Sequence, residues 1–332
     1  MQPSGPWRLF WNRFKRERAA VGAGIFLLVL LVTIIGGGPI LSRVLGHGPN
    51  DLFPYAVSDA LQPVGPWTRV PDTGYFTDGP PPEQKTLLVL GADSSLGRDE
   101  LLRLLDGGRV SLAVALGGTL LAMAIGTLIG SIAAYFGRWV DAIVSRTTEL
   151  VMAFPLLFFI IMLGSTAGDR LDHVTLGGLL VPGVFPLILI IGAFTWFYPA
   201  RIVRTEIQSL RQREFVEAAR MVGASDARIL RKHLVPHLVP TLISYTTLLL
   251  AANILLEAGL SYLGVGIDLP TASWGSLLST TWGTARSPNP TADDASVWLT
   301  LFPSLAILLT VLSFNLLGEG LRSASDPSGT RR

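Results

Sequence analysis

One polar segment of the chain carries the residue types best suited to specific recognition. It spans residues 200–237, between two long apolar stretches, and we call it the polar segment. Its characteristic residues are, in chain order, Glu217, Ala218, Ala219, Gly223, His233 and Pro236. Small alanine side chains let a partner surface approach the backbone closely, and the Glu217 carboxylate can accept hydrogen bonds or pair with a cation. This chemistry indicates a docking contact; the residues alone leave open an amphipathic helix lying on a membrane surface without a partner.

The polar segment is expected to fold as two short helices joined by a glycine turn. Apolar residues recur at helical spacing at Phe215, Ala218, Ala219 and Val222. Gly223 should break this first helix, and Ser225 or Asp226 can cap a second one. Pro236 should end the second helix.

Acidic residues inside apolar stretches are the second group of candidates. Glu257 lies in a long apolar run, and Glu149 lies near the end of another. A charge at the centre of a membrane helix costs roughly 2.5–3.5 kcal/mol on insertion scales, so such residues usually face a cavity or a partner. Two interpretations remain: a contact in a transport pathway or gate, or a hydrogen bond between helices in which Asn253 is the partner of Glu257.

No arrangement of residues predicts catalysis, a metal site or a cofactor on this chain. His233 and His237 are four residues apart but lack a third ligand, and Asp169, Asp172 and His173 are expected in a solvated loop. Cysteine is absent, which excludes disulfides and thiol chemistry. The chain contains no G-x4-G-K-[ST] run that could cradle ATP phosphates. The sequence therefore predicts a protein that is not itself an enzyme.

The composition places these residues in an integral membrane protein. Of 332 residues, 49% are hydrophobic and 15% are charged, with a mean hydropathy of +0.49, whereas soluble domains carry about 25% charged residues. The net charge of +2 is too small to indicate nucleic acid as a partner. A spanning helix needs roughly 20 apolar residues. Six segments qualify: residues 19–41, 110–136, 143–165, 176–198, 238–263 and 297–317.

Basic residues at the ends of these segments predict the orientation. With the N-terminus inside, the inner segments hold 18 Lys and Arg residues and the outer segments hold 8. Cytoplasmic loops carry the excess of positive charge, so both termini are expected in the cytoplasm. The first apolar run follows a basic stretch, as in a signal peptide, but it is long and lacks an A-x-A site. We expect an uncleaved first span.

The chain divides into five parts on this basis. They are a basic N-terminal segment (residues 1–18), a first transmembrane helix (19–41), an extracytoplasmic insert with an interfacial helix (42–107), a transmembrane domain that includes the polar segment (108–320), and a cytoplasmic tail (321–332). Residues 42–88 are rich in Pro, Gly and Asp and are expected to be irregular. A short amphipathic helix at residues 100–105 should lead into the second span. Pro155, Pro182 and Pro186 predict kinks in the third and fourth spans.

The spacing of the polar segment resembles the signature cytoplasmic loop of binding-protein-dependent ABC importer permeases, E-A-A-x3-G-x9-I-x-L-P. The matching residues here are Glu217, Ala218, Ala219, Gly223 and Pro236. His233 replaces Ile, as is usual in the peptide/nickel branch, and Val235 replaces Leu.

Other stretches resemble the OppC/DppC-type permeases of that branch. They are LGADSSLGRD (residues 90–99), GRVSL (108–112), AYFGRWVD (134–141), AFP (153–155), LEAGLSYLGVG (256–266), PTASWG (270–275), LFPSLAI (301–307) and FNLLG (314–318). The resemblance covers residues 8–328 apart from most of 42–88. Ala92 departs from it where Thr is usual, and Glu149 stands where Asp is common.

This resemblance implies an all-α polytopic membrane protein with six transmembrane helices and the type I ABC importer permease fold. The chain would be a permease subunit that forms half of an ATP-driven import pathway, for di- or oligopeptides, in the plasma (inner) membrane of a prokaryote. Its implied partners are two ATP-binding subunits, identical or paired, a second permease subunit, an extracytoplasmic solute-binding protein and membrane lipids. The polar segment would couple to the ATPase, through Glu217, Ala218, Ala219, Gly223, His233 and Pro236. Without the resemblance, an ion-coupled secondary transporter or channel with Glu257 as its relay remains the alternative.

Overall fold

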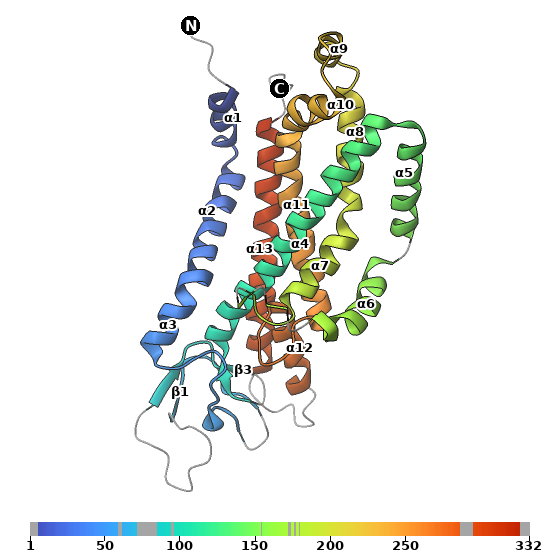
Figure 1. Cartoon of the computed structure of the whole chain (residues 1–332). Coiled ribbons are helices and arrows are strands. Elements are labelled where there is room, and N and C mark those ends of the chain that lie inside the picture. The colour runs from blue at the N-terminus through green and yellow to red at the C-terminus, as the bar shows by residue number, and fades with distance from the viewer. Residues whose placement is uncertain are drawn as a thin grey trace.

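Long apolar runs of the sequence form long helices in the computed structural model (Figure 1). The structure describes residues 6–58, 62–71, 85–93, 96–153, 155–171, 174–175, 177–178, 180–285 and 295–325. Four helices in this part are long and apolar enough to cross a membrane: Arg18–Leu45, Glu100–Phe136, Asp226–Tyr262 and Val297–Ser325. Two bent helix pairs also qualify, so counting each pair as one span gives the six spans expected.

The two bent pairs differ from the straight spans expected at residues 143–165 and 176–198. Helices α5 (Arg138–Ala153) and α6 (Leu156–Leu171) meet at 85° beside Pro155. Helices α7 (Val184–Thr195) and α8 (Phe197–Leu210) meet at 42°. Pro199 explains the second bend, because it cannot donate to the carbonyl of Thr195 and its ring crowds that group. The expected kink at Pro182 and Pro186 is wrong, since Pro182 precedes α7 and Pro186 lies in its first turn.

The second span begins earlier than expected. Helix α4 (Glu100–Phe136) is continuous, so the separate interfacial helix predicted at residues 100–105 is the first turn and a half of this span. Asp99 caps it, because its side chain accepts hydrogen bonds from the amides of Leu101 (2.8 Å) and Leu102 (3.2 Å).

The first and last spans also extend beyond their expected ends. Helix α1 (Pro6–Phe14) precedes α2 (Arg18–Val32), which continues through a π-helical turn, η1 (Thr33–Gly37), into α3 (Gly38–Leu45). The glycines at residues 36–38 therefore do not end the first span. Helix α13 (Ala295–Ser325) runs into the predicted tail, and residues 326–332 lie outside the described part.

The insert after the first span contains more structure than its composition suggests. Strands β1 (Thr68–Pro71) and β2 (Lys85–Leu88) pair antiparallel, as do β3 (Ala92–Asp93) and β4 (Arg98–Asp99). A short 3-10 turn, η2 (Pro54–Ala56), packs beside them. Their small core consists of Phe53, Ala56, Val70, Leu88 and Ala92. The described parts of residues 42–88 are thus a small folded unit, whereas we expected irregular structure.

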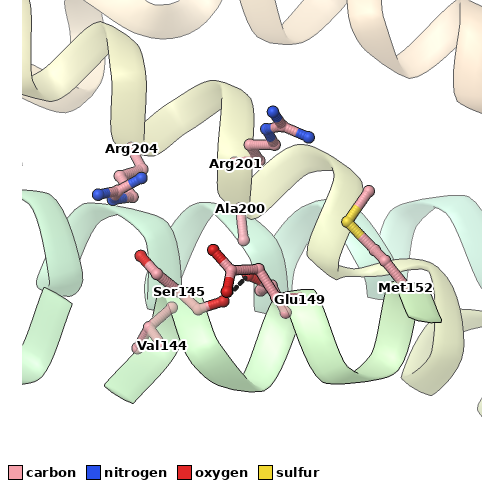
Figure 2. Close-up of a pocket in the computed structure, with 8 residues that line it drawn as sticks. Val144, Ser145, Glu149, Met152, Ala200, Arg201 and Arg204 are labelled. Carbon is pink, nitrogen blue, oxygen red and sulfur yellow. Dashed lines mark hydrogen bonds between the residues drawn. The ribbon is translucent and has the colours of Figure 1, made fainter. Parts of the chain in front are cut away.

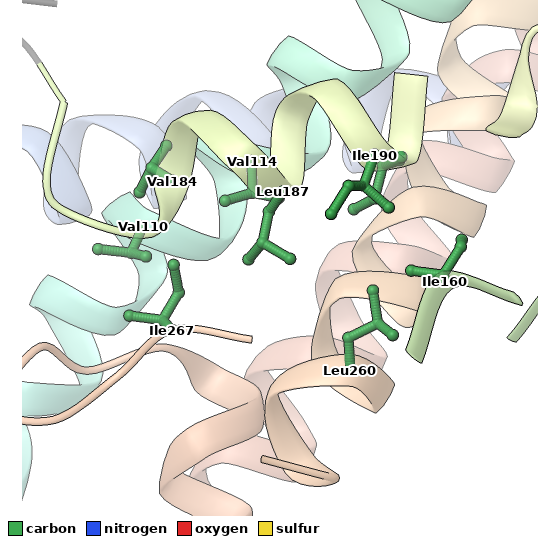
Figure 3. Packing of buried hydrophobic residues seen from close by; sticks show 9 residues of the cluster. Val110, Val114, Ile160, Val184, Leu187, Ile190, Leu260 and Ile267 are labelled. Atoms are coloured by element: carbon green, nitrogen blue, oxygen red, sulfur yellow. The ribbon is translucent and has the colours of Figure 1, made fainter. Parts of the chain in front are cut away.

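The helices pack around two apolar cores near the strand end of the molecule. One core joins α4, α6, α7 and α11 (Val235–Tyr262); its buried members include Val110, Ile160, Leu187, Ile190 and Leu260 (Figure 3). The other surrounds Trp274, the first residue of α12 (Trp274–Ala285). The fully buried Trp274 donates from its indole nitrogen to the carbonyl of Leu104 (3.0 Å).

Helices α4 and α8 approach each other closely through two glycines one turn apart. A Cβ atom at Gly126 would lie 2.5 Å from the carbonyl oxygen of Trp196, and one at Gly130 would overlap the carbonyl oxygen of Ala200. Such small-xxx-small pairs allow backbone contact between membrane helices. This contact fixes the position of α8, which carries the polar segment.

Candidate functional site

The polar segment forms one end of the structure. After α8 the chain enters α9 (Glu214–Met221), a glycine turn, and a helix that begins at Asp226. Figure 1 shows α9 beyond the ends of the long helices, at the same end as α1 and opposite to the β-strands and α12. The expected connection at residues 200–237 is shorter in the structure, because residues 200–210 belong to α8 and residues 226–237 to the helix that becomes α11.

Helix α9 has a packed face and an exposed face. Val216 is fully buried, and Phe215 and Ala219 pack beside it against Ile229, Leu234 and Leu238. Glu217 and Ala218 are exposed on the other face, as are Met221 (84%) and Val222 (88%) at the tip. The apolar residues recognised in the sequence therefore divide between the two faces: Phe215 and Ala219 pack inward, whereas Ala218 and Val222 are exposed. The exposed face combines a carboxylate, a small residue and an apolar tip.

The turn after α9 depends on Gly223, as the sequence predicts. Gly223 has φ +80°, in the left-handed region that disfavours other residues. Its amide donates to the carbonyl of Arg220 (2.9 Å), and the amide of Ala224 donates to the carbonyl of Ala219 (3.0 Å). This pair of bonds is the Schellman pattern, which satisfies carbonyls that a helix end leaves free.

The second helix of the polar segment is not short. Helix α10 (Asp226–Arg228) continues through a π-helical segment, η3 (Ile229–Leu234), into α11. Pro236 therefore does not end a helix, contrary to the prediction; it is the second residue of α11, inside the continuous helix Asp226–Tyr262. The amide of Val235 donates to the carbonyl of Leu230, five residues earlier, so the backbone hydrogen bonds before the proline are of the π-helical type, not the α-helical type. Ser225 occupies the capping position without a side-chain capping bond.

Residues at the end of α4 hold the polar segment at several points. The guanidinium of Arg211 donates to the carbonyls of Ala134 (3.1 Å) and Tyr135 (2.9 Å). The hydroxyl of Tyr135 donates to the carboxylate of Asp226 (2.5 Å), and the guanidinium of Arg220 lies 5.9 Å from the centre of the Tyr135 ring. Sequence reasoning assigned none of these roles, because the partners lie far apart along the chain.

One histidine of the polar segment, His237, is engaged in packing. The ring of His237 stacks on Phe215, with centroids 5.0 Å apart, and its Nδ1 lies 2.5 Å from the carbonyl of His233. Among the described residues no group of three His, Asp or Glu could hold a metal ion. Asp172 and His173 of the second cluster considered lie outside the described residues, as does the side chain of Asp169.

The charged residues of α5 lie against α8 or on the surface. Asp141 accepts a bidentate pair from Arg204, with 2.8 Å between Nη2 and Oδ2. Glu149 forms an exposed ion pair with Arg146 (3.0 Å). Glu149 also lines a cavity of about 170 Å³ between α5 and α8 (Figure 2).

Glu257 and Asn253 are buried but are not partners of each other. The hydroxyl of Ser261 donates to Glu257 (2.7 Å), and the hydroxyls of Ser111 and Ser273 also interact with this carboxyl group. Asn253 donates instead to the hydroxyl of Thr119 on α4 (2.9 Å). The predicted bond between Asn253 and Glu257 is therefore wrong, although both residues do connect helices.

A second charged cluster lies at the opposite end, in the folded insert. The fully buried Arg103 contacts Asp93 (2.6 Å) and donates to Asn50 (2.8 Å) and to the carbonyl of Pro270 (3.1 Å). Arg98 pairs with the same carboxylate (2.7 Å). These contacts fasten the insert to α4 and to the loop before α12.

A buried histidine forms the edge of this cluster. The Nε2 atom of His47 lies 3.0 Å from the carboxylate of Asp99, the residue that caps α4. Burial lowers the pKa of His47, but the hydrogen bond and the negative charge of Asp99 outweigh it, so the pKa is raised overall.

The family models match most of the chain. Residues 126–330 match the model described as binding-protein-dependent transport system inner membrane component. Residues 5–63 match the N-terminal TM domain of oligopeptide transport permease C.

Curated relatives are similar over nearly their whole length. A putative peptide permease protein of Brucella suis biovar 1 is 36% identical over 324 residues, which is 98% of this chain and 92% of the relative. The glutathione transport system permease protein GsiD of Pectobacterium atrosepticum is 35% identical, covering 97% and 91%. The oligopeptide transport system permease protein OppC of Haemophilus influenzae is 34% identical, covering 97% and 88%. The chain therefore belongs to the inner membrane components of binding-protein-dependent transport systems, as a permease subunit of the OppC type.

Proposed function

We propose that this importer permease carries short peptides and that its polar segment couples the helices to an ATPase. The observation that carries the coupling proposal is the exposed face of α9, where Glu217, Ala218, Met221 and Val222 face away from the rest of the chain. A carboxylate beside apolar and small residues suits a complementary cleft in another subunit. The alternative, an ion-coupled secondary transporter or channel, is not favoured by the family.

Each residue of the proposed coupling site has a distinct part. Glu217 and Ala218 would contact the ATPase directly, since both are exposed. Ala219 and Gly223 would hold the shape of α9, because Ala219 packs inward and its carbonyl accepts the bond that closes the glycine turn. His233 and Pro236 would transmit movement, as they lie where the π-helical segment joins α11.

The assembly proposed around this chain follows from its family and its shape. It would contain two ATP-binding subunits, a second permease that supplies the other half of the pathway, and an extracytoplasmic binding protein. The polar segment and both termini would lie in the cytoplasm of a prokaryote. The excess of basic residues at that end, and the position of α9 at the same end of the structure as α1, support this orientation (Figure 1).

Peptides are the proposed solute because the relatives named above are permeases for peptides, oligopeptides or glutathione. Uptake by the complete complex in proteoliposomes tests this, with labelled dipeptides, oligopeptides and glutathione compared with Ni²⁺. Uptake of Ni²⁺ alone would overturn the proposed substrate class and leave the coupling proposal intact.

Coupling is tested by Glu217→Ala in the same complex, with Glu214→Ala as the matched control. Both residues are exposed glutamates in the first turn of α9, so each substitution removes one negative charge from the same end of the helix. Loss of one partner of a buried, hydrogen-bonded charge pair at an interface costs about 2–5 kcal/mol, so peptide uptake by Glu217→Ala should fall at least roughly tenfold, while Glu214→Ala retains uptake. Equal uptake by both variants would contradict the proposed role of Glu217.

For two of the polar candidates within spans, Glu257 and Asn253, we propose a role in helix packing. Both are almost completely inaccessible to solvent, and each bonds a hydroxyl of this chain. Glu149 remains the candidate for the transport pathway.

A further inference from the structure

Helix α5 exposes charge where a membrane helix should not. None of its residues is fully buried, although α5 with α6 is long and apolar enough to form a span. The side chains of Arg146 and Glu149 are 83% and 63% exposed. Charged groups in contact with lipid tails are strongly disfavoured, so residues of this kind face water or another protein.

The polar residues of α5 face a hollow beside α8. The cavity between them, about 170 Å³ in volume, is lined from α5 by Ser145, Thr148, Glu149 and Met152, and from α8 by Arg201 and Arg204 (Figure 2). The α5 residues recur at intervals of three and four, so they form one continuous face. A cavity of this size has room for several waters.

Two polar groups in this hollow have no protein partner. The Oγ atom of Ser145 is buried and makes no hydrogen bond within the described residues. The guanidinium of Arg201 forms no ion pair in that same part of the chain. Buried polar groups such as the Ser145 hydroxyl are nearly always satisfied by protein or water, and Arg201 is exposed and open to water, so the hollow is suited to water or to a polar solute.

The ends of the hollow are defined by two other features. The bidentate pair of Arg204 and Asp141 closes it on the side of the polar segment. Beyond Met152 the chain bends by 85° beside Pro155, so α5 does not continue along α8. A movement of α8, which leads to α9, would therefore change the width of the hollow.

We infer that the α5 face bearing Ser145, Thr148 and Glu149, together with Arg201 of α8, lines the water-filled path of the transported solute near the end that carries α9. The face presents hydroxyls, a carboxylate and a guanidinium, which can replace water around the ammonium and carboxylate groups of a zwitterion such as a short peptide. This inference rests on the proposed function and adds the residues that line the path.

The absence of cysteine in the natural chain provides a direct test. Thr148→Cys and Met152→Cys, both at positions that line the hollow, are made singly, and the variants that retain uptake in the complete complex are treated with a charged, lipid-insoluble methanethiosulfonate. Leu116→Cys and Leu128→Cys are the controls, since both leucines are exposed on the apolar surface of α4. Labelling of this chain is followed by mass spectrometry, so cysteines of the partner subunits do not interfere.

We expect the cysteines in the hollow to react at least about tenfold faster than the controls, because the thiolate forms readily only in water. Their rate should differ with and without ATP, and modification should block peptide uptake. Reaction as slow as that of Leu116→Cys and Leu128→Cys in both nucleotide conditions would overturn the inference.

The two proposals fail separately. If the unmodified complex imports no peptide, the proposed substrate is wrong whatever the labelling shows. If the complex imports peptide and both cysteines in the hollow stay unreactive, or if their modification leaves uptake intact, only the assignment of the path is wrong.

Discussion

The hydroxyl of Tyr135 donates a hydrogen bond of 2.5 Å to the carboxylate of Asp226, which is 91 residues away in the sequence. Tyr135 stands at the end of α4, and Asp226 begins the helix that becomes α11. The backbone of Tyr135 also accepts a bond from Arg211, and its ring lies beside Arg220. Tyr135 thus contacts the polar segment before α9, in α9 and after α9, so a displacement of α9 would be passed to both long helices.

Removal of this hydroxyl by Tyr135→Phe should loosen the polar segment without disturbing the core. Asp226 is exposed and stays hydrated, so the loss is that of one ordinary hydrogen bond, about 0.5–1.5 kcal/mol. Amide hydrogen exchange in residues 214–229 should become faster. Tyr198→Phe is the control, because Tyr198 makes no side-chain hydrogen bond within the described residues. Unchanged exchange in Tyr135→Phe would show that the bond does not hold the segment.

Gly223→Ala should impair coupling through the backbone alone. No atom lies within 4 Å of a Cβ built at this position, so the substitution introduces no clash. The cost is that of a left-handed conformation, roughly 1–2 kcal/mol for an ordinary residue. The amount of peptide imported per ATP hydrolysed should fall. In Gly223→Asn this amount should fall less than in Gly223→Ala, since Asn tolerates the left-handed conformation better.

The control for this prediction is Gly22→Ala. Gly22 also has open space around a Cβ atom, but it lies in regular helix. Equal transport by Gly22→Ala and Gly223→Ala would contradict a conformational role for Gly223.

Gly130→Ala should destabilise the contact of α4 with α8. Its Cβ atom would overlap the carbonyl of Ala200, and a backbone group cannot move aside as a flexible side chain can. Overpacking of this kind costs typically 1–3 kcal/mol, and it should lower the thermal unfolding midpoint of the purified complex. Gly259→Ala, in α11 with open space at its Cβ, should leave the midpoint unchanged. A midpoint for Gly130→Ala equal to that of Gly259→Ala would show that the helices separate easily.

Local signals in the sequence predict much of the fold and part of the site. Apolar runs near 20 residues gave the spans, and the residues from Glu217 to Gly223 predicted α9 and its glycine turn, because helix length and a left-handed glycine are local properties. The same local rules were wrong at Pro236, which looked like a helix end. A proline inside a continuous helix has the same sequence signature as one after its last turn, and only the register of η3 distinguishes them.

Contacts between distant residues could not be predicted from one sequence. Nothing near Tyr135 indicates Asp226, and nothing near Arg103 indicates Asn50 or Pro270, because these pairs form only when separate helices and loops pack. The folded insert was missed for a similar reason. Its strands are too short for a periodic pattern, and the proline content of the segment obscured the five residues of its core.

Arg103→Ala should severely destabilise the end of the molecule that carries the insert. It leaves the buried Asp93 with one fewer cation and leaves Asn50 and the carbonyl of Pro270 unpaired. Removal of one partner of a buried ion pair costs about 3–5 kcal/mol. Protease sensitivity of residues 46–99 should rise, and the unfolding midpoint should fall. Arg109→Ala breaks only an exposed contact with Asp106 (3.7 Å) and should cost about 0–1 kcal/mol; an equal effect of both variants would refute the role of the buried network.

The pair of His47 and Asp99 should make the stability of the insert depend on pH. Because the folded pKa of His47 is raised above its ordinary value of about 6.5, protonation favours the folded state. The stabilisation is complete below that ordinary value and is lost as the pH rises through the folded pKa. The difference in unfolding midpoint between the natural chain and His47→Gln should therefore be larger near pH 5.5 than near pH 8.5. The matched control is His233→Gln, since His233 has no ion-pair partner within the described residues, and it should show no such change. A difference for His47→Gln that is equal at both pH values would mean that the histidine stabilises the insert by packing, through its edge contact with Phe53, and not by charge.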